Sequence, residues 1–416
     1  MGRRSNRAWR SVLLTSLPYS TATPGSASMT QQADLRPAAS EHTGPPKEWF
    51  LDEAWFRRDL EAVFKPRWLL AGHVTELSTP GAYLTYALGE DEVVIQKDES
   101  GTIHAFHNVC AHRGAKLCPE RSGRGSKRRI ICPYHGWSYS ASDGSLMAAP
   151  GMHDGFDKAP WGLTPAHVDV WNGLIMVSFA AERPLPMNEH MGGFSMGKYD
   201  TSRIKVAATK SHLVNANWKV VVENNLECYH CAINHPELLS SFDWKASKDD
   251  DFDGTVAARE AGLEVWHLEL DVPFTLNNAR VCKANMPRLD ENLDAATIAC
   301  FWEPGFAFTL AKDYGWIFSP RALSPSLTEI RQYWLVAEDA VEGVDYTREE
   351  VMEFWDVTLQ QDRELCENVA AGMGMEAYSP GPLNRLYQSG QAAFFAWYTR
   401  QMREHYPDEV RESGVV

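Results

Sequence analysis

The spacing of apolar residues changes twice along the chain, from helical to alternating and then to a mixture of both. Residues 47–68, KEWFLDEAWFRRDLEAVFKPRW, carry apolar side chains at helical intervals and predict an N-terminal helix. Its expected packing positions are Phe50, Trp55, Leu60, Val63 and Phe64. From residue 81 to about residue 181, short alternating segments such as AYLTYAL and DEVVIQKD are separated by Gly, Asp and Asn turns, which predicts a small antiparallel sandwich.

A proline-containing junction, AAERPLPM, ends this strand-rich region, and longer strands such as SLTEIRQYWLVAED then alternate with helical patterns. The second region is therefore expected to be an antiparallel sheet covered by helices, so that the fold class is α+β. We predict three parts: a disordered extension over residues 1–45, an all-β domain with its N-terminal helix over residues 46–185, and a second domain over residues 186–416.

One helix near the C-terminus, in TREEVMEFWDVTLQQDRELCENV, has a clear beginning. Thr347 and Glu350 form the S/T-x-x-E arrangement, in which each side chain satisfies a free backbone N–H at the start of a helix. Asp362 then falls among the apolar residues Leu359 and Leu365, on the surface that should pack. Because an unpaired buried carboxylate is costly, Asp362 is expected to have a specific role there.

The composition limits the partners. Forty basic and fifty-five acidic side chains give a formal net charge of −15, which argues against nucleic acid or an anionic membrane and favours a small soluble substrate. No apolar run approaches the roughly twenty residues that cross a bilayer, so no membrane span is expected. The eight cysteines are scattered and form no disulfide framework, which indicates a cytoplasmic protein that uses thiols as metal ligands.

The first forty residues are basic, rich in Ser, Thr, Ala and Pro, and poor in periodic apolar residues, so they should be disordered. Their Arg and Ser content resembles an organellar transit peptide, whereas the apolar stretch SVLLTSLPY is too short and interrupted for a secretory signal. We favour a third interpretation, in which translation begins at Met29. In each case this segment lies outside the fold.

Two short motifs between predicted strands combine cysteine with histidine. CAHRGAKLC contains Cys110 and His112, and CPYHGWSY contains Cys132 and His135. Two thiolates and two imidazoles fit a tetrahedral zinc site or a Rieske [2Fe–2S] cluster. The flanking residues favour the second alternative, because the chain resembles the Rieske family, whose boxes read C-x-H-R-G and C-P-x-H-G-W.

The Rieske resemblance implies that Cys110 and Cys132 hold the inner iron of the [2Fe–2S] cluster, while His112 and His135 hold the outer, partly exposed iron. Imidazole ligation raises the reduction potential to between about −150 and +300 mV, so such a cluster accepts electrons and passes them on. Cys118 lies outside both boxes and is expected to be structural.

The segment NNLECYHCAINHP contains two further histidines, His230 and His235. A regular helix would not align them, but Pro236 marks a helix that unwinds in its last turn, where both rings can converge on one ion. Two histidines and a remote carboxylate, with positions left open, define the facial triad of non-haem Fe(II) oxygenases, and Asp362 is the candidate third ligand. An electron-transfer cluster in the same chain supports this interpretation over a pair of packed histidines.

From Lys47 onward the chain resembles the oxygenase component of Rieske non-haem iron oxygenases. The family's catalytic box reads N-W-K, then an acid, then H-x-x-x-x-H, and it occurs here as Asn217, Trp218, Lys219, Glu227, His230 and His235. The resemblance implies that Glu227 bridges His230 to a Rieske histidine of a neighbouring subunit in a head-to-tail homotrimer. The family usually has aspartate at this position, but a glutamate still offers acceptors for two imidazole N–H groups. The alternative for Glu227 is a solvated helix acid.

Glutamate at this position, with the wording around it, resembles the branch that acts on quaternary ammonium compounds, including glycine betaine, choline and carnitine. The resemblance implies O₂-dependent hydroxylation of an N-methyl group with release of formaldehyde, mononuclear Fe(II) as a second cofactor, and electrons from a separate flavin- or ferredoxin-type reductase. The alternatives are hydroxylation or O-demethylation of an aromatic compound and, outside the enzymes, a Rieske electron-transfer protein.

Three further patterns have simpler alternatives. Aromatic ring faces would bind a methylammonium group, and the candidates are Phe301, Trp302, Phe306, Phe308, Tyr314 and Trp316, although alternating aromatics in strands are typical of a core. Cys228 and Cys231 are expected to pack, with a redox-active C-x-x-C pair as the alternative. GMGMEA follows a predicted helix instead of a strand, so it is not expected to bind a nicotinamide cofactor.

Overall fold

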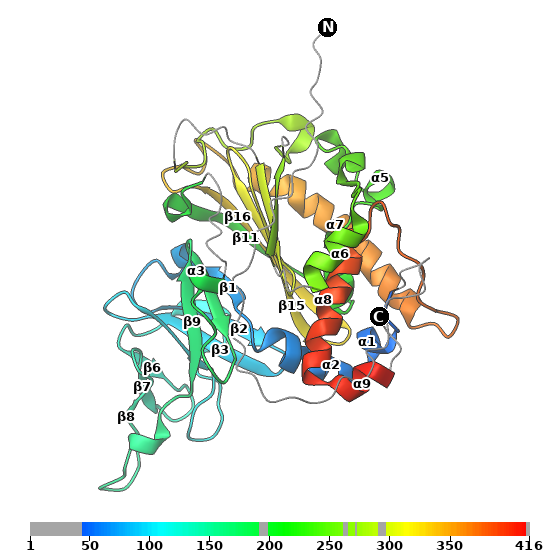
Figure 1. Cartoon of the computed structure of the whole chain (residues 1–416). Helices are drawn as coiled ribbons and strands as arrows, with labels where there is room; N and C mark the ends of the chain where they lie inside the picture. Colours follow the sequence, from blue (N-terminus) through cyan, green and yellow to red (C-terminus); the bar gives the residue numbers. More distant parts are fainter. Residues whose placement is uncertain (1–43, 191–198, 261–264, 271–272, 290–296, 413–416) are drawn as a thin grey trace.

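A computed structural model describes residues 44–190, 199–260, 265–270, 273–289 and 297–412. Within them the chain forms a strand-rich unit and a second unit in which helices cover an antiparallel sheet (Figure 1). The expected α+β fold class is confirmed. The predicted disordered extension lies outside the described residues, except for residues 44 and 45.

The predicted N-terminal helix is divided into three pieces. α1 (Glu48–Leu51) stops at Asp52, whose extended backbone (φ −81°, ψ 130°) interrupts the helix. The Asp52 carboxylate then accepts the Trp55 N–H at 2.7 Å and caps α2 (Glu53–Asp59), which continues into the π-helical turn η1 (Leu60–Phe64). A single helix was expected, but the capping preference of aspartate prevails at this position. All five expected packing residues of the segment contact the main core.

The strand-rich unit contains a seven-stranded and a three-stranded sheet. The seven strands lie in the order β1 (Leu69–His73), β10 (Leu174–Ser178), β9 (Pro165–Trp171), β4 (Ile103–His107), β3 (Asp91–Lys97), β2 (Ala82–Leu88) and β5 (Ser122–Arg124). The smaller sheet, β6 (Arg129–Ile131), β7 (Ser138–Ser140) and β8 (Leu146–Ala148), projects at one end of the molecule (Figure 1). The predicted alternating strands are present, and β2 covers the segment AYLTYAL.

The second sheet separates two cores. Its strands lie in the order β11 (Ile204–Val214), β16 (Leu327–Ala337), β15 (Gly315–Ser324), β14 (Phe306–Leu310), β13 (Thr297–Trp302) and β12 (Val265–Leu270), with antiparallel neighbours. Along β16, Trp334 and Val336 face the helices, whereas Tyr333 and Leu335 face Trp68 and its neighbours in the strand-rich unit. The strand is therefore apolar on both faces.

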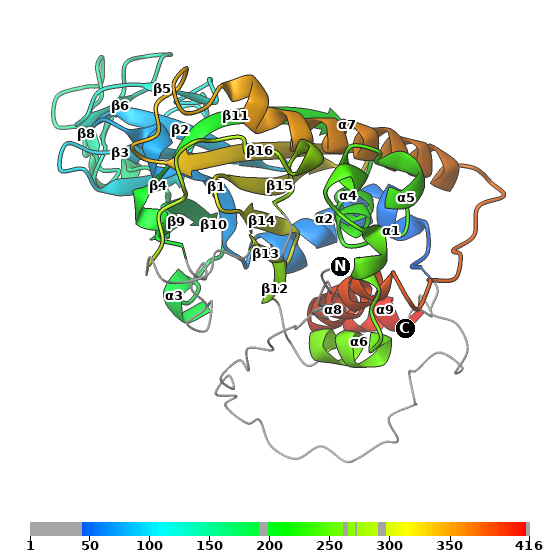
Figure 2. The same cartoon turned by 90° about the horizontal axis from the view of Figure 1, so that it is seen from above.

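Three helices cover one face of this sheet: α4 (Trp218–Asn225), α7 (Arg348–Met373) and α8 (Ser389–His405) (Figure 2). The predicted capping box of α7 is confirmed, because Thr347 and Glu350 each bond the other's backbone N–H. The shorter described helices are η2 (Val74–Leu77), η3 (Ala159–Trp161), α3 (Met187–His190), η4 (Thr201–Arg203), α5 (Cys231–Asn234), η5 (Leu238–Ser240), η6 (Trp244–Ser247), α6 (Phe252–Glu260), η7 (Leu276–Asn278) and α9 (Pro407–Glu412). In the part of the chain that is described, no helix has the length and apolar character of a membrane span.

The main core crosses from the N-terminal helices into the second unit. Trp49 packs at 5.1 Å between ring centroids against Tyr398 of α8, and Trp55 Nε1 donates to the Tyr398 hydroxyl at 2.7 Å. The domain boundary expected between residues 185 and 186 stays a prediction.

Candidate metal centres

A buried anchor holds the beginning of α4. Asn217 caps the helix by accepting the Lys219 N–H at 3.0 Å, and its amide donates to Phe50 O at 2.9 Å. Trp218 Nε1 donates to the Asp59 carboxylate at 2.9 Å, and the Lys219 ammonium forms an ion pair with the same carboxylate. The N-W-K box therefore ties α4 to the last residue of α2.

Neither charge of this anchor is accessible to solvent. Burial raises the pKa of Asp59, which the charge and hydrogen bonds of Lys219, Tyr398 and Trp218 oppose. Burial lowers the pKa of Lys219, which Asp59 opposes. Because each charge depends on the other for compensation, the loss of either partner would leave a buried charge unpaired.

The chain leaves α4 and turns before it reaches the first candidate iron ligand. Glu227 lies outside helical structure, and its Oε2 accepts the backbone N–H groups of Tyr229 and His230. Its Oε1 accepts from His230 Nδ1 at 2.7 Å. Glu227 and His230 are thus in contact, as the family resemblance implied, although the chain between them is not helical. The side chain of Glu227 stabilises the turn itself.

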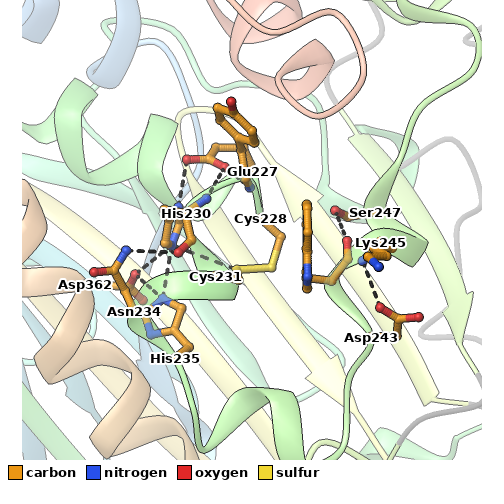
Figure 3. Close-up of a disulfide and its surroundings, with 12 residues drawn as sticks. Glu227, Cys228, His230, Cys231, Asn234, His235, Asp243, Lys245, Ser247 and Asp362 are labelled. Carbon is orange, nitrogen blue, oxygen red and sulfur yellow. Dashed lines mark hydrogen bonds and ion pairs between the residues drawn. A yellow bond between two sulfur atoms is a disulfide. The ribbon is translucent and has the colours of Figure 1, made fainter.

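The two candidate histidines flank a separate one-turn helix, α5. This differs from the expected last turn of a longer helix, because α4 already ends at Asn225. His230 precedes α5, and His235 follows it with a non-helical backbone (φ −122°, ψ 69°). The short helix brings the two Nε2 atoms to 3.0 Å from each other (Figure 3).

Asp362 approaches the same point from α7. Its Oδ1 lies 3.2 Å from His230 Nε2 and 3.0 Å from His235 Nε2. With metal–ligand bonds of about 2.1 Å, such separations correspond to ligand–metal–ligand angles of about 90°. This is the angle between three ligands on one face of an octahedron, as in a facial triad.

The remaining ring nitrogens show where the protons lie. His235 Nδ1 donates to Gln361 Oε1 at 2.8 Å, and His230 Nδ1 donates to Glu227, so both Nδ1 atoms carry hydrogen. Gln361 is held in this orientation because its Nε2 donates to Glu237 Oε2 at 2.7 Å. In neutral rings the two Nε2 lone pairs then converge with the carboxylate oxygen, an arrangement that a cation stabilises. These residues therefore fit a metal ion.

The carboxylates around the rings attract protons as well as metals. Burial lowers the pKa of His230, but the hydrogen bonds and charges of Asp362 and Glu227 outweigh burial and raise it to about 9. Burial also lowers the pKa of His235, and Asp362 again produces a net rise. Burial raises the pKa of Asp362, yet the two histidines bring it below its ordinary value. Metal binding at this point should consequently release protons.

Cys228 and Cys231 form a disulfide beside this site (Figure 3). Both residues pack in one apolar cluster, as expected, but they are also bonded to each other, because the turn around His230 brings their Cα atoms to 5.0 Å, within the range of a disulfide. The other six cysteines, all within the described residues, form no disulfide.

The two cysteine–histidine boxes form neighbouring loops at the far end of the strand-rich unit. Cys110 and Cys132 are 3 % and 2 % exposed, whereas His112 and His135 are exposed. The two imidazole rings lie 4.8 Å apart between centroids, and His112 stacks on Trp137 at 4.7 Å. The sulfurs thus face inward and the imidazoles face outward.

This arrangement suits a cluster better than a single ion. The sulfurs and the imidazoles form two separate pairs, buried and exposed, whereas one zinc ion would be surrounded by all four ligands. The Tyr139 hydroxyl lies 3.0 Å from Cys110 Sγ and gives the buried sulfur a polar partner. Gly114 and Gly136, with φ of 73° and 72°, allow each loop to turn back on its cysteine. The loops therefore fit two irons, each with one type of ligand.

A small cavity lies between the end of α4 and the turn from β13 to β14. Its enclosed volume is about 10 Å³, room for about one water molecule, and its lining is Val222, Asn225, Leu226, Phe301, Trp302, Glu303, Gly305 and Phe306. Three of the six candidate aromatics thus border the cavity. Of the others, Phe308 is a core residue, Tyr314 donates to Phe274 O, and Trp316 stacks on Trp355 at 4.0 Å.

Sequence reasoning did not identify Asp59 or Gln361. Asp59 had a usable signal, since it is an acid among the apolar packing positions of the N-terminal helix, as Asp362 is in α7. Gln361 had none beyond its place next to Asp362, because its partner His235 lies 126 positions away.

Comparisons with known proteins agree with this geometry. Residues 67–167 match the family described as the Rieske [2Fe-2S] domain, and residues 201–404 match the ring hydroxylating alpha subunit (catalytic domain). The glycine betaine monooxygenase oxygenase subunit of Chromohalobacter salexigens is 33% identical over 408 residues, which cover 92% of this chain and 91% of that protein. The corresponding subunit of Pseudomonas aeruginosa is 32% identical over 403 residues, with 91% and 93% covered.

A solved structure of a quaternary ammonium Rieske monooxygenase, described in connection with carnitine oxidation and inter-subunit electron transfer, has a TM-score of 0.71. Its sequence is 21% identical, and the match covers 87% of this chain and 96% of the other. At this identity the likeness shows a shared fold.

Proposed function

The chain belongs to the Rieske ring-hydroxylating oxygenases, and on that premise we propose that it hydroxylates an N-methyl group of a quaternary ammonium compound such as glycine betaine. The chain is the oxygenase component of a monooxygenase with a Rieske [2Fe–2S] cluster and a mononuclear iron, and a separate reductase supplies its electrons. The observation that carries the substrate proposal is 33% identity, over nine-tenths of both chains, to a glycine betaine monooxygenase oxygenase subunit.

The proposed reaction is balanced as follows. One oxygen atom of O₂ is inserted into a C–H bond of an N-methyl group, and two electrons and two protons convert the other oxygen atom into water. The resulting N-hydroxymethyl group loses a proton from its hydroxyl, and the C–N bond breaks. The products are formaldehyde and an amine with one methyl group fewer.

Seven residues are assigned to the two metal centres. Cys110 and Cys132 hold the inner iron of the cluster, His112 and His135 the outer iron, and His230, His235 and Asp362 the mononuclear iron. Buried sulfurs, exposed imidazoles and separations near 3.0 Å between triad atoms support this assignment. When bound, the mononuclear iron supplies O₂ activation.

The residues around the triad hold its ligands in place. Glu227 and Gln361 accept the Nδ1 protons of the two histidines, which directs both Nε2 lone pairs to one point.

The placement of the two centres supports a head-to-tail homotrimer. In both views the small sheet β6–β8, which adjoins the loops with the two cysteine–histidine boxes, lies at one end of the molecule (Figures 1 and 2). The helix α5, which lies between His230 and His235, is at the other end. Each centre borders exposed apolar side chains, Tyr134 at 58% beside the Rieske loops and Ile233 at 87% on α5. Such surfaces are typical of contact sites, and a heterologous contact repeated three times closes a ring. Glu227 would then connect His230 to His135 of the partner subunit.

The electron donor and the location of the protein are also part of the proposal. A flavin- or ferredoxin-type reductase is proposed as the donor, because the relatives are oxygenase subunits. A cytoplasmic location is proposed because only two of the eight cysteines are joined in a disulfide.

A formaldehyde-release screen tests the proposed function. The iron-loaded protein, a surrogate reductase and NADH are incubated with glycine betaine, choline, carnitine and, as the rival class, aromatic methyl ethers. Formaldehyde and the demethylated amine should appear with one of the first three. Turnover of the ethers alone would replace the substrate assignment. Two irons per chain, instead of three, with no turnover would identify an electron-transfer protein.

A further inference from the structure

The Cys228–Cys231 disulfide closes the turn that positions His230 (Figure 3). Cys228 is partly exposed, whereas Cys231 is 3 % exposed and begins α5. Cys231 lies in a small apolar cluster with Leu238, Phe242, Phe274 and Phe354. A reductant in solution therefore reaches the sulfur of Cys228 first, and the sulfur of Cys231 is the leaving group.

The Cys231 sulfur also borders the triad. Its Sγ lies 4.0 Å from His230 Nε2, and the ligand atoms of Cys231, His230 and His235 all lie within 4.8 Å of one another. A nitrogen and a sulfur bound to one metal, at about 2.1 and 2.3 Å, are separated by about 3.1 Å at an octahedral angle and about 3.6 Å at a tetrahedral angle. The observed separation exceeds these values by about 0.9 and 0.4 Å, so a side-chain shift of less than about 1 Å brings the sulfur to the metal.

We propose that Cys228 and Cys231 form a reversible redox site, and that its reduced form supplies Cys231 as a thiolate ligand to the mononuclear metal. The proposal rests on the assignment of His230, His235 and Asp362 to that metal. A disulfide sulfur carries no charge and leaves the remaining positions open for oxygen chemistry. A thiolate occupies one of them and favours softer ions such as zinc.

A dithiol supplies the two electrons for reduction. One of its thiolates attacks Cys228 Sγ, the S–S bond breaks, and Cys231 leaves as a thiolate that takes up a proton or binds the metal. The second thiolate of the reductant displaces Cys228 from the mixed disulfide, which yields the Cys228 thiol and a disulfide in the reductant. In the opposite direction, hydrogen peroxide accepts two electrons, so that two thiols and one peroxide give the disulfide and two water molecules.

Alkylation of the unmodified holoenzyme tests the redox site. After peroxide treatment, the peptide that contains Cys228 and Cys231 should resist alkylation. After treatment with dithiothreitol, removal of the reductant and denaturation in the alkylating reagent, it should take up two alkyl groups, as mass spectrometry would show. Full alkylation of this peptide after peroxide treatment would overturn the redox site.

Two matched variants test the ligand role. Cys228→Ser and Cys231→Ser both abolish the disulfide, but only Cys228→Ser keeps a sulfur at position 231. The EPR signal of the nitric oxide adduct of the ferrous mononuclear site reports its ligands. Cys228→Ser and reduced wild type should share one shifted signal, while Cys231→Ser should keep the signal of oxidised wild type under both conditions. The same signal in both variants would overturn thiolate ligation.

These outcomes separate this inference from the proposed function. Formaldehyde release from betaines together with identical signals in the two variants would remove only the role of Cys231. The absence of any nitric oxide adduct signal in wild type that retains its Rieske absorption would overturn both the triad and the inference that rests on it.

Discussion

Lys219→Met should destabilise the protein strongly, although residue 219 is no candidate metal ligand. The ammonium of Lys219 and the carboxylate of Asp59 are both fully buried. After the substitution the Asp59 carboxylate keeps two hydrogen-bond donors, Trp218 and Tyr398, but loses the ammonium with which it forms an ion pair. The removal of one member of a buried pair costs about 3–5 kcal/mol.

A double variant separates the ion pair from the side chains themselves. In Asp59→Asn with Lys219→Met no buried charge remains, and the amide oxygen still accepts from Trp218. We expect the double variant to lose about 1–2 kcal/mol, which is less than either single variant. Lys127→Met is the matched surface control, because Lys127 forms an ion pair with Glu99 while its side chain is 57% exposed. This variant should lose at most about 1 kcal/mol of unfolding free energy.

The loss in Lys219→Met should also depend on pH. Burial already raises the pKa of Asp59, and removal of the ammonium raises it further. A folded pKa above the unfolded value makes the folded state bind protons more readily, so the variant gains stability as pH falls. Its deficit relative to wild type should therefore be smaller at about pH 5 than at about pH 8.

Chemical denaturation of the metal-loaded proteins, followed by tryptophan fluorescence, measures these differences. The proposed dependence of the two buried charges on each other is refuted if Lys219→Met is no less stable than Lys127→Met. It is also refuted if the stability loss of the double variant equals the sum of the losses in Asp59→Asn and Lys219→Met.

Further predictions concern the two metal centres. His235→Ala should lower the iron content from three to two per chain and abolish product while the Rieske absorption persists; normal turnover would contradict the triad. Glu227→Gln should slow the single-turnover oxidation of the reduced Rieske cluster in the presence of O₂ and substrate, because an amide does not accept hydrogen bonds from two imidazoles as a carboxylate does. Glu227→Asp should keep part of the wild-type rate. An unchanged rate in Glu227→Gln would exclude Glu227 from the path of electrons between the two centres. Mixed trimers of Cys132→Ala and His235→Ala should recover activity that neither has alone, and no recovery would argue against transfer between subunits. Fe(II) binding to the apoprotein should weaken as pH falls below about 9, the pKa of His230, because a proton then competes with the metal for the imidazole. Calorimetry in two buffers with different ionisation enthalpies would detect the protons released on binding. An affinity that does not depend on pH would contradict this prediction.

The sequence by itself determined the features that depend on neighbouring residues. Alternation predicted the strands of the first unit, the Thr347–Glu350 box predicted the start of α7, and short spacings revealed both cysteine–histidine motifs. These signals are readable because backbone geometry places residues two to four positions apart in fixed relations. Where another local preference competed, the prediction failed: Asp52 capped a new helix, and the turn at Glu227 ended the helix expected to carry both histidines.

Only the tertiary structure decided which distant groups meet. Asp362 lies 132 positions from His230, and Lys219 lies 160 positions from Asp59, so neither contact leaves a periodic trace in the sequence. An acid on an apolar helix face shows that some partner is required, because a lone buried charge is costly, but it does not show which one. The choice depends on how helices and sheet pack, and packing also set the short turn in which Cys228 and Cys231 come close enough to bond.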